Sequence, residues 1–256
     1  MTQFQSRWLA LALVLAGSSC KLFAVDGVIL IDQNRALAGN VTPGDAPGFP
    51  VTITQPGSYR LAGNLTVPNA NTTAILVNSE FVTIDLNGFD ILGPTFCVGK
   101  GVCTGVGTGI GVDGNSHGVT VVNGGIHGMG NDGINVGGGA FASGSKVDNV
   151  HADANGGSGI TLFGGTASGN TANNNGANGI IVDGTASGNI ADKNRTAGIA
   201  GIVESTIKGN RTLDNGSYGI RATCPSSVVD NTASRNGLFN IATNGPSCVI
   251  DHNAAP

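Results

Sequence analysis

Two overlapping segments, GITLFGGTASGNTANNNGANGI at residues 159–180 and GIIVDGTASGNIADKNRTAGI at residues 179–199, decide the fold of this chain. Both begin and end with Gly-Ile, and both contain the pentapeptide TASGN, whose copies start at Thr166 and Thr185. Self-similarity at a period of about 20 residues is typical of chains that stack one structural unit on the next. This region therefore consists of repeated coils that fold only against their neighbours.

Gly-Ile pairs mark the length of each coil along the rest of the chain. Successive pairs are 19 to 26 residues apart. A left-handed β-helix would need a regular hexapeptide rhythm and a leucine-rich repeat would need its Leu-rich consensus, and neither is present. The series runs Gly109-Ile110, Gly133-Ile134, Gly159-Ile160, Gly179-Ile180, Gly198-Ile199 and Gly219-Ile220, with Asn240-Ile241 closing it.

Asparagines recur in the same rhythm and form two columns. Stacked strands lie about 4.8 Å apart, so an Asn amide in register can donate to the carbonyl of the next coil and satisfy polar groups buried by the turns. The first predicted ladder contains Asn149, Asn170, Asn189, Asn210 and Asn231. The second contains Asn155, Asn175, Asn194, Asn215 and Asn236.

These motifs, together with GIRATCPSSVVDNTASRNGLFNI at residues 219–241, resemble the right-handed parallel β-helix proteins of the pectin-lyase-like superfamily. The resemblance covers roughly residues 66–253. It implies an all-β fold, a single-stranded right-handed parallel β-helix, or solenoid, of short coils of about 19–26 residues with an N-terminal cap. Such motifs specify a fold well and a function poorly.

The N-terminal part of the chain divides into two segments before the repeats. Residues 1–24 are typical of a signal peptide, with Arg7 before the apolar run at residues 8–17, which is too short to span a bilayer. Residues 25–65 are expected to cap the solenoid, with a short helix within residues 32–40, and residues 66–256 to form the β-helix domain. We therefore expect a secreted, periplasmic or cell-envelope protein with no membrane span in the mature chain.

The net charge bears on the kind of partner, and the cysteines bear on disulfides and metal binding. The formal net charge of −4 becomes −6 when residues 1–24, which hold Arg7 and Lys21 but no acid, are removed, and this argues against nucleic acid. Four cysteines remain, an even number that suits an exported chain. We interpret them as the disulfides Cys97–Cys103 and Cys224–Cys248, because no pair has the two-residue spacing usual for a four-Cys metal site. No cofactor and no metal are expected.

The resemblance implies activity on acidic polysaccharides, and each enzyme class needs a recognisable set of side chains. A calcium-dependent lyase needs carboxylates on neighbouring coils, whereas Asp113 and Asp183 on the Gly-Ile strand are three coils apart. A hydrolase of the polygalacturonase type needs a group of Asp residues that includes an adjacent pair, and the chain contains no Asp-Asp. Neither pattern is present.

One segment, VDNVHADANG, retains catalytic potential. Asp148, His151 and Asp153 lie within six residues, with His127 and Asp132 about one coil earlier. A His between carboxylates is a candidate base or metal ligand, although the same residues also suit a solvated turn.

Other charges have a structural explanation. Lys193, Asp214 and Arg235 alternate in sign from coil to coil, which favours cross-coil ion pairs.

Three functions remain open from the sequence. The preferred one is binding of a polysaccharide or cell-surface glycan, or of another extended surface, without catalysis. The first alternative is a polysaccharide lyase, epimerase or hydrolase acting on acidic polysaccharide. The second is a structural or adhesive module. The sequence does not predict an oligomeric state.

Overall fold

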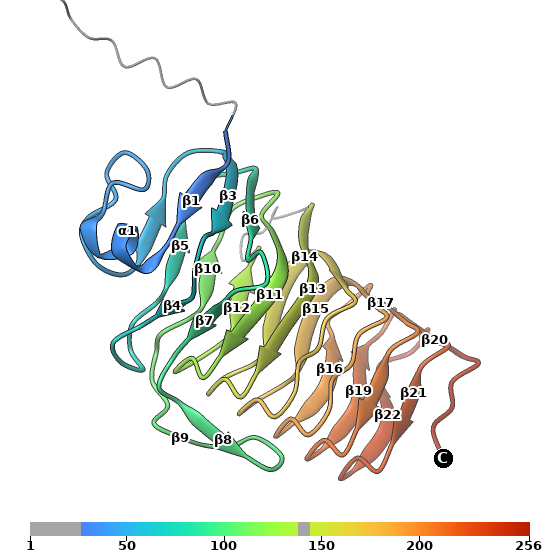
Figure 1. Cartoon of the computed structure of the whole chain (residues 1–256). Helices are drawn as coiled ribbons and strands as arrows, with labels where there is room; N and C mark the ends of the chain where they lie inside the picture. Colours follow the sequence, from blue (N-terminus) through green and yellow to red (C-terminus); the bar gives the residue numbers. More distant parts are fainter. Residues whose placement is uncertain (1–26, 138–143) are drawn as a thin grey trace, which may run out of the picture.

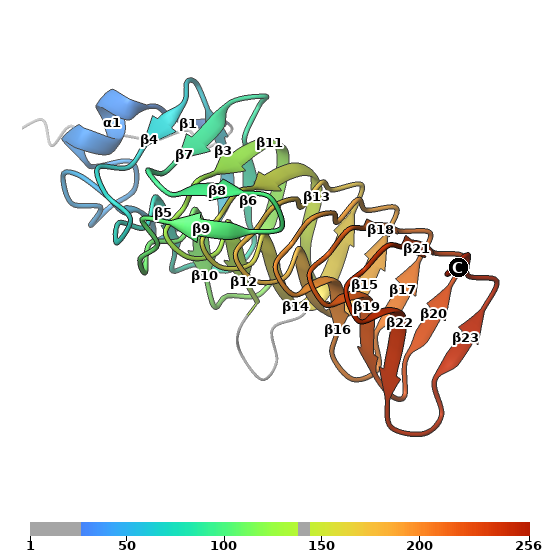
Figure 2. The same ribbon diagram turned by 90° about the horizontal axis from the view of Figure 1, so that it is seen from below.

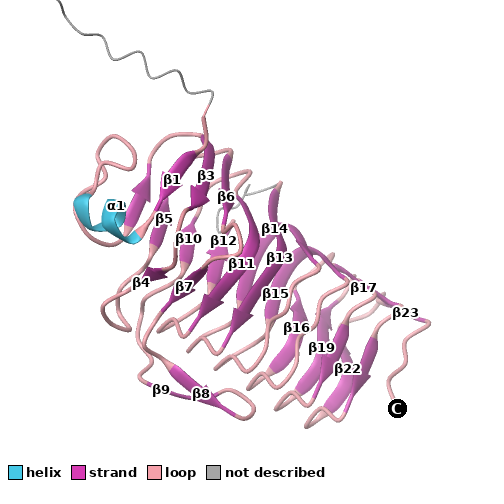
Figure 3. Cartoon of the chain, in the orientation of Figure 1, coloured by secondary structure: helices cyan, strands magenta, loops and turns pink. Residues whose placement is uncertain are grey.

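The computed structural model describes residues 27–137 and 144–256. The predicted signal peptide, residues 1–24, lies outside the described residues. The described chain forms a right-handed parallel β-solenoid of about nine turns with one short helix, as predicted from the repeats (Figure 1). Figure 3 shows strands along the whole solenoid and the helix at its N-terminal end.

Three parallel ladders of strands run along the solenoid, and each coil contributes one strand to each ladder in most turns. The first ladder carries the Gly-Ile residues. It contains β2 (Val51–Ile53), β5 (Ile75–Val77), β10 (Val112–Gly114), β12 (Ile134–Val136), the first halves of β14 (Ile160–Ser168) and β15 (Ile180–Ser187), β16 (Ala197–Gly201), β19 (Tyr218–Thr223) and β22 (Phe239–Asn244).

The second and third ladders complete the coils. The second contains β1 (Ile29–Ile31), β3 (Gly57–Leu61), β6 (Val82–Asp85), the first halves of β11 (Thr120–His127) and β13 (Ser145–Asp153), the second halves of β14 and β15, β17 (Thr206–Lys208), β20 (Ser227–Val229) and β23 (Val249–Asp251). The third contains β4 (Leu65–Thr66), β7 (Asp90–Leu92), the second halves of β11 and β13, single bridges at Thr171 and Ile190, β18 (Arg211–Leu213) and β21 (Thr232–Ser234).

The core is a stack of branched aliphatic side chains between the ladders. Ile134, Ile160, Ile180, Ile199 and Ile220 are each fully buried and aligned from coil to coil, as predicted. Their removal from water is the main favourable term for a solenoid whose single coils have no core of their own.

The structure corrects the sequence alignment of the coils at the first Gly-Ile pair, Gly109-Ile110, which is out of register with the others. Val112, not Ile110, pairs with Ile134. The glycine that precedes the core residue is therefore Gly111, where an added Cβ would lie 2.5 Å from the carbonyl oxygen of Gly133. The backbones of successive coils approach too closely at this position for any side chain.

The two asparagine ladders lie inside the turns and are buried, except at the C-terminal end, where Asn236 is half-buried. Asn194 is typical: its Nδ2 donates to the Ala172 carbonyl at 2.9 Å and to Asn215 Oδ1 at 3.1 Å, and its Oδ1 accepts from the backbone and side-chain amides of Asn175. Every hydrogen-bonding atom of the amide group is thus used between coils, so the register is fixed by polar contacts as well as by the core.

Asn149 does not belong to the first ladder, contrary to the prediction. Val150 occupies the ladder position, because its N–H donates to Asn170 Oδ1 at 2.9 Å. Asn149 stands one residue earlier, in a left-handed conformation with φ of 54°, and its exposed amide bonds Asn123 of the preceding coil. The ladder instead extends at its other end, where Asn231 bonds Asn253.

The N-terminal segment joins the solenoid before residue 66. Strands β1 to β4 each pair in parallel with the strand of the next coil in the same ladder. The predicted helix is α1 (Gln33–Ala38), whose N-cap Asp32 accepts a hydrogen bond from the Arg35 N–H. In Figure 1, α1 lies at the N-terminal end of the solenoid, where a cap would cover open strand edges.

Cross-coil charges also follow the predicted pattern in part. The Arg235 guanidinium donates to both oxygens of Asp214, at 3.1 and 2.9 Å. These hydrogen bonds lower the pKa of the Asp214 carboxyl. Both groups are at the surface, where such pairs contribute little to stability.

Both disulfides are present. Cys97–Cys103 closes an antiparallel hairpin of β8 (Phe96–Val98) and β9 (Val102–Thr104). Cys224–Cys248 joins the turn after β19 to the turn after β22, with a Cα–Cα distance of 5.0 Å, and so connects the last two coils.

Replacing one ladder amide by a carboxyl tests whether the ladder holds the coils together. Asn194→Asp removes two donated hydrogen bonds at a fully buried position and should lower the free energy of unfolding by about 2–4 kcal/mol. Chemical denaturation measures the change. The matched control, Asn149→Asp, changes an exposed amide outside the ladder and should stay within about 0.5 kcal/mol of wild type. Equal losses in both variants would contradict the ladder's role.

Removal of the C-terminal disulfide should destabilise the solenoid locally. Cys224→Ser combined with Cys248→Ser opens the loop of 24 residues that the disulfide closes. In the chain-entropy model, closing such a loop adds on the order of 3 kcal/mol to the free energy of unfolding. Hydrogen exchange should therefore become fast after Gly219 while the central coils stay protected, because a terminal coil has a neighbour on one side only. Uniform acceleration along the solenoid would contradict this expectation.

Candidate functional site

The outward side of the third ladder gathers ionisable side chains from three successive coils. Asp90 comes from β7, His127 from β11, and His151 and Asp153 from β13. Along β13, Val150 and Ala152 are buried, so His151 and Asp153 face outward together. The register places His127 beside Asp153, and Gly125 between Asp90 and His151.

These side chains surround a shallow surface cavity of about 410 Å³, which we call the His–Asp hollow. It is lined by Gly88, Asp90, Asn123, Gly124, Gly125, His127, Asn149, His151 and Asp153. Gly125 forms its floor, and an added Cβ there would lie 2.1 Å from Asp90 Oδ1 and 2.3 Å from His127 Nε2. The missing side chain at residue 125 therefore makes room for the groups around it.

Each of the two carboxyl groups in the hollow, those of Asp90 and Asp153, lies near an imidazole. His127 Nε2 lies 3.4 Å from Asp90 Oδ1, with both side chains partly exposed. Asp153 Oδ1 accepts the Asn173 N–H at 2.7 Å. Burial raises the pKa of the Asp153 carboxyl, against the opposing effects of that hydrogen bond and of the nearby imidazoles of His127 and His151. The lining residues include no Lys or Arg.

Asp148, which the sequence grouped with His151 and Asp153, does not line the hollow. The chain bends at Asn149, so Asp148 belongs to the second ladder, where it pairs with Ser168. Its carboxylate accepts from Ser168 Oγ at 2.5 Å and from Lys146 Nζ at 3.2 Å, and these bonds lower its pKa. A catalytic role for His151 and Asp153 stays a prediction.

Asp132 is also placed elsewhere. It lies in the turn before β12 and accepts from the Ser158 N–H at 2.7 Å and from Thr161 Oγ1 at 2.8 Å, on the side of the first ladder. Burial raises the pKa of its carboxyl. Its hydrogen bonds to the next coil give it a structural role in the turn.

Asp90 is the group that sequence reasoning missed. The alternation of side chains along β7 could have indicated it. Ile91 is buried and aligns with Ile126, so Asp90 and Leu92 on either side of it face outward. The hairpin between β7 and β10 lengthens this coil and hides the alignment.

Two kinds of feature are absent from residues 27–137 and 144–256. No group of three or more His, Cys, Asp or Glu side chains there is arranged to hold a metal ion. Within the same residues, no helix is both long and apolar enough to cross a membrane.

Comparison with solved structures agrees with the architecture. The periplasmic alginate epimerase AlgG superposes with a TM-score of 0.51 at 16% identity, over 85% of this chain and 64% of that chain. The shared fold is the right-handed parallel β-helix. A double mutant of AlgG gives a TM-score of 0.50 at 16% identity, over 79% of this chain and 60% of the other. The chain thus spans less than two thirds of either epimerase chain.

Sequence comparisons add no further relatives. No protein-family model and no curated protein matches the chain. The superposition on AlgG shows the shared fold, and at 16% identity it does not transfer a site.

The raised pKa of Asp153 predicts the sign of a pH effect. Because folding favours its protonated form, the stability that this carboxyl contributes falls as the pH rises from its ordinary value of 3.8 through the folded pKa. Asp153→Asn keeps an acceptor for Asn173 and does not titrate. The free energy of unfolding of this variant, relative to wild type, should therefore rise between about pH 3.5 and about pH 7.

Asp148→Asn is the matched control, since the pKa of Asp148 is lowered by folding. Wild type gains stability as the pH rises through the lowered folded pKa of Asp148 to the ordinary value of 3.8, so the relative stability of this variant should fall over that more acidic interval and level off above about pH 5. Denaturant titrations at several pH values measure both slopes. Slopes of the same sign would contradict the different surroundings assigned to the two carboxyls.

Proposed function

We propose that this protein is an extracytoplasmic β-helix that binds polysaccharide across the coils at the His–Asp hollow. The observation that carries the proposal is the convergence of Asp90, His127, His151 and Asp153 from three successive coils on a glycine floor. None of these side chains is needed for the core, because all four point outward.

The chemistry of the hollow suits sugar hydroxyls. A carboxylate accepts hydrogen bonds through two oxygens, and a neutral imidazole offers one donor and one acceptor. Asn123 and Asn149 at the rim add amides that both donate and accept. The hollow is open and crosses neighbouring coils, which suits an extended chain better than a small ligand enclosed on most sides.

Charge favours a neutral glycan over a polyuronate. Asp90 and Asp153 line the hollow, and no Lys or Arg lines it to offset a bound uronate carboxylate. Like charges in one site repel each other and raise the cost of binding. A neutral polysaccharide has no such cost.

Location outside the cytoplasm has three supports. Cys97–Cys103 and Cys224–Cys248 are typical of chains that fold in an oxidising compartment. The structurally similar AlgG is described as periplasmic. The expected signal peptide at residues 1–24 fits the same location.

Catalysis on a polysaccharide is the second candidate, and Asp153 favours it. A carboxyl whose pKa is raised by burial, beside His127 and His151, is the type of group that serves as a general acid or base. Enzymes of this fold include an epimerase that, by its name, acts on alginate. Lyase, epimerase and hydrolase activity all remain within this candidate.

Binding is tested by a glycan array of neutral and acidic polysaccharides, followed by titration calorimetry of the best ligand. His151→Ala and Asp153→Asn should each weaken binding by about tenfold or more, because each removes a hydrogen-bonding partner in the hollow. Asp148→Asn, on the same strand but outside the hollow, should bind as wild type. A wild-type protein without any glycan signal, or a His151→Ala variant with unchanged affinity, would contradict the proposal.

Catalysis is separated from binding by incubating the protein with the ligands found. Reducing ends would report hydrolysis, ultraviolet absorbance of unsaturated products would report a lyase, and altered sugar stereochemistry by NMR would report an epimerase. Loss of product in Asp153→Asn would support a site in the hollow. Activity unchanged in both His151→Ala and Asp153→Asn would place the chemistry elsewhere.

A further inference from the structure

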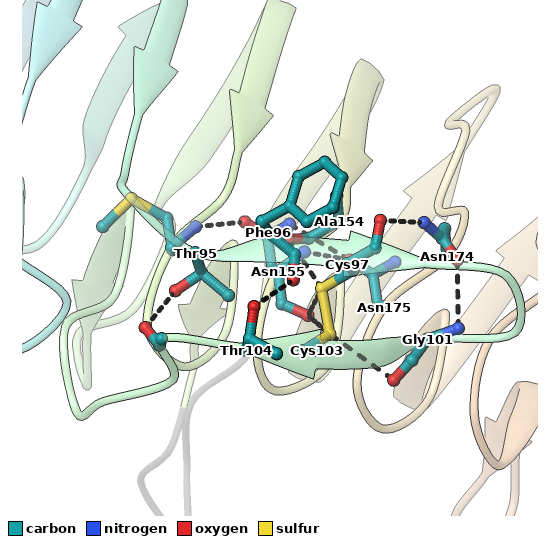
Figure 4. Close-up of a disulfide and its surroundings, with 12 residues drawn as sticks. Thr95, Phe96, Cys97, Gly101, Cys103, Thr104, Ala154, Asn155, Asn174 and Asn175 are labelled. Atoms are coloured by element: carbon teal, nitrogen blue, oxygen red, sulfur yellow. Dashed lines mark hydrogen bonds between the residues drawn. A yellow bond between two sulfur atoms is a disulfide. The ribbon is translucent and has the colours of Figure 1, made fainter.

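The disulfide-closed hairpin β8–β9 runs along the turns of the solenoid (Figure 2), and its contacts place it next to strands that line the His–Asp hollow. The Thr95 N–H donates to the carbonyl of Gly128 at 2.8 Å, and Gly128 directly follows His127. Cys97 Sγ lies 3.1 Å from the carbonyl oxygen of Ala154, which directly follows Asp153. Phe96, between these two contacts, therefore lies over the ends of the strands that present His127 and Asp153 (Figure 4).

Phe96 faces away from the solenoid. Cys97 and Cys103 are paired across the hairpin and pack against the carbonyls of the turn, and Cys97 is buried. Side chains alternate along a strand, so Phe96 and Val98 lie on the opposite side of β8. The Phe96 side chain is 66% exposed, and an exposed aromatic contributes little to the stability of the fold.

The backbone of the hairpin that carries this exposed ring is held against the solenoid. The Gly101 N–H donates to Asn174 Oδ1 at 3.0 Å, and Asn174 Nδ2 donates back to the Cys97 carbonyl at 2.9 Å. An added Cβ at Gly101 would lie 1.9 Å from the Asn175 carbonyl oxygen, so this part of the hairpin is pressed against the coil. The backbone at Phe96 is therefore positioned before a ligand binds, so little backbone entropy is lost on binding.

We propose that Phe96 is an aromatic platform that stacks on the apolar face of one pyranose ring of the bound polysaccharide. The inference rests on the proposed function and adds a residue outside the hollow to it. A pyranose presents C–H groups on its faces and hydroxyls around its edge, and the face of a phenyl ring carries negative charge density that attracts C–H groups. The apolar face of the sugar would cover Phe96 while its hydroxyls reach His127 and Asp153.

A sugar fits this position better than an apolar protein segment. The exposed ring lies on a hairpin anchored beside the ends of two strands of the hollow, which is lined by two carboxylates, two imidazoles and two amides. An apolar partner covering Phe96 would also cover some of these groups and leave them without hydrogen-bond partners, which costs free energy. An amphipathic sugar ring satisfies both surfaces at once.

The test compares Phe96→Ala, Phe96→Trp and Val98→Ala in the full chain against the glycan that wild type binds. Loss of the ring contact should raise the Kd of Phe96→Ala on the order of tenfold, from the apolar area left uncovered. Phe96→Trp should bind at least as well as wild type. Val98→Ala is the matched control on the same side of β8, farther along the hairpin, and should change Kd less than about twofold.

Fluorescence gives a second readout at the platform. Trp8, the single tryptophan of the chain, lies in the expected signal peptide, so Phe96→Trp in the mature chain places its only indole at residue 96. Titration with the glycan should shift its emission with the same Kd as calorimetry reports. Emission that does not change while calorimetry records binding would overturn the platform.

The outcomes separate this inference from the function on which it rests. If His151→Ala weakens binding and Phe96→Ala does not, the platform is overturned and the hollow stands. If wild type binds no glycan, both are overturned. Equal weakening by Phe96→Ala and Val98→Ala also overturns the platform, since it would assign the effect to the hairpin as a whole. Thermal unfolding of each variant confirms that it is folded.

Discussion

The hydrogen bonds between buried asparagine side chains are the interaction on which the structure depends. Each ladder amide, such as that of Asn194, donates to one coil and accepts from another. A slip of a coil by one residue would leave such a group buried and unpaired and would turn core residues outward. The aliphatic core supplies most of the favourable free energy, whereas the ladders select the single register in which that core forms.

The His–Asp hollow is a consequence of this register. His127 and Asp153 are neighbours because their strands are aligned residue for residue. The left-handed bend at Asn149 decides which outward residues of β13 face the hollow and which face the second ladder. Gly125 leaves the space that the surrounding side chains need. Side chains far apart in sequence thus meet on a rigid scaffold, which suits a binding site.

The repeats predicted the fold and nine of the ten ladder asparagines, because these features recur at a nearly constant step, whereas the even number and the spacing of the cysteines predicted both disulfides. The errors lie where the step changes. Asn149 and Asp148 were misplaced because a single residue with positive φ at 149 shifts the alternation along β13. Asp90 was missed because the β8–β9 hairpin lengthens its coil. Ile110 was misaligned because two Gly-containing dipeptides, at 109 and 111, compete for one position. Bends and insertions of this kind leave little signal in spacing alone.

The central claim is that polysaccharide binds at the His–Asp hollow, and the imidazole signals of the four histidines test it most directly. Two of them, His127 and His151, line the hollow, whereas His117 and His252 do not. Two-dimensional NMR of the histidine rings during titration with the bound glycan should shift the resonances of His127 and His151 and leave those of His117 and His252 in place. Binding that leaves His127 and His151 unshifted would contradict the claim.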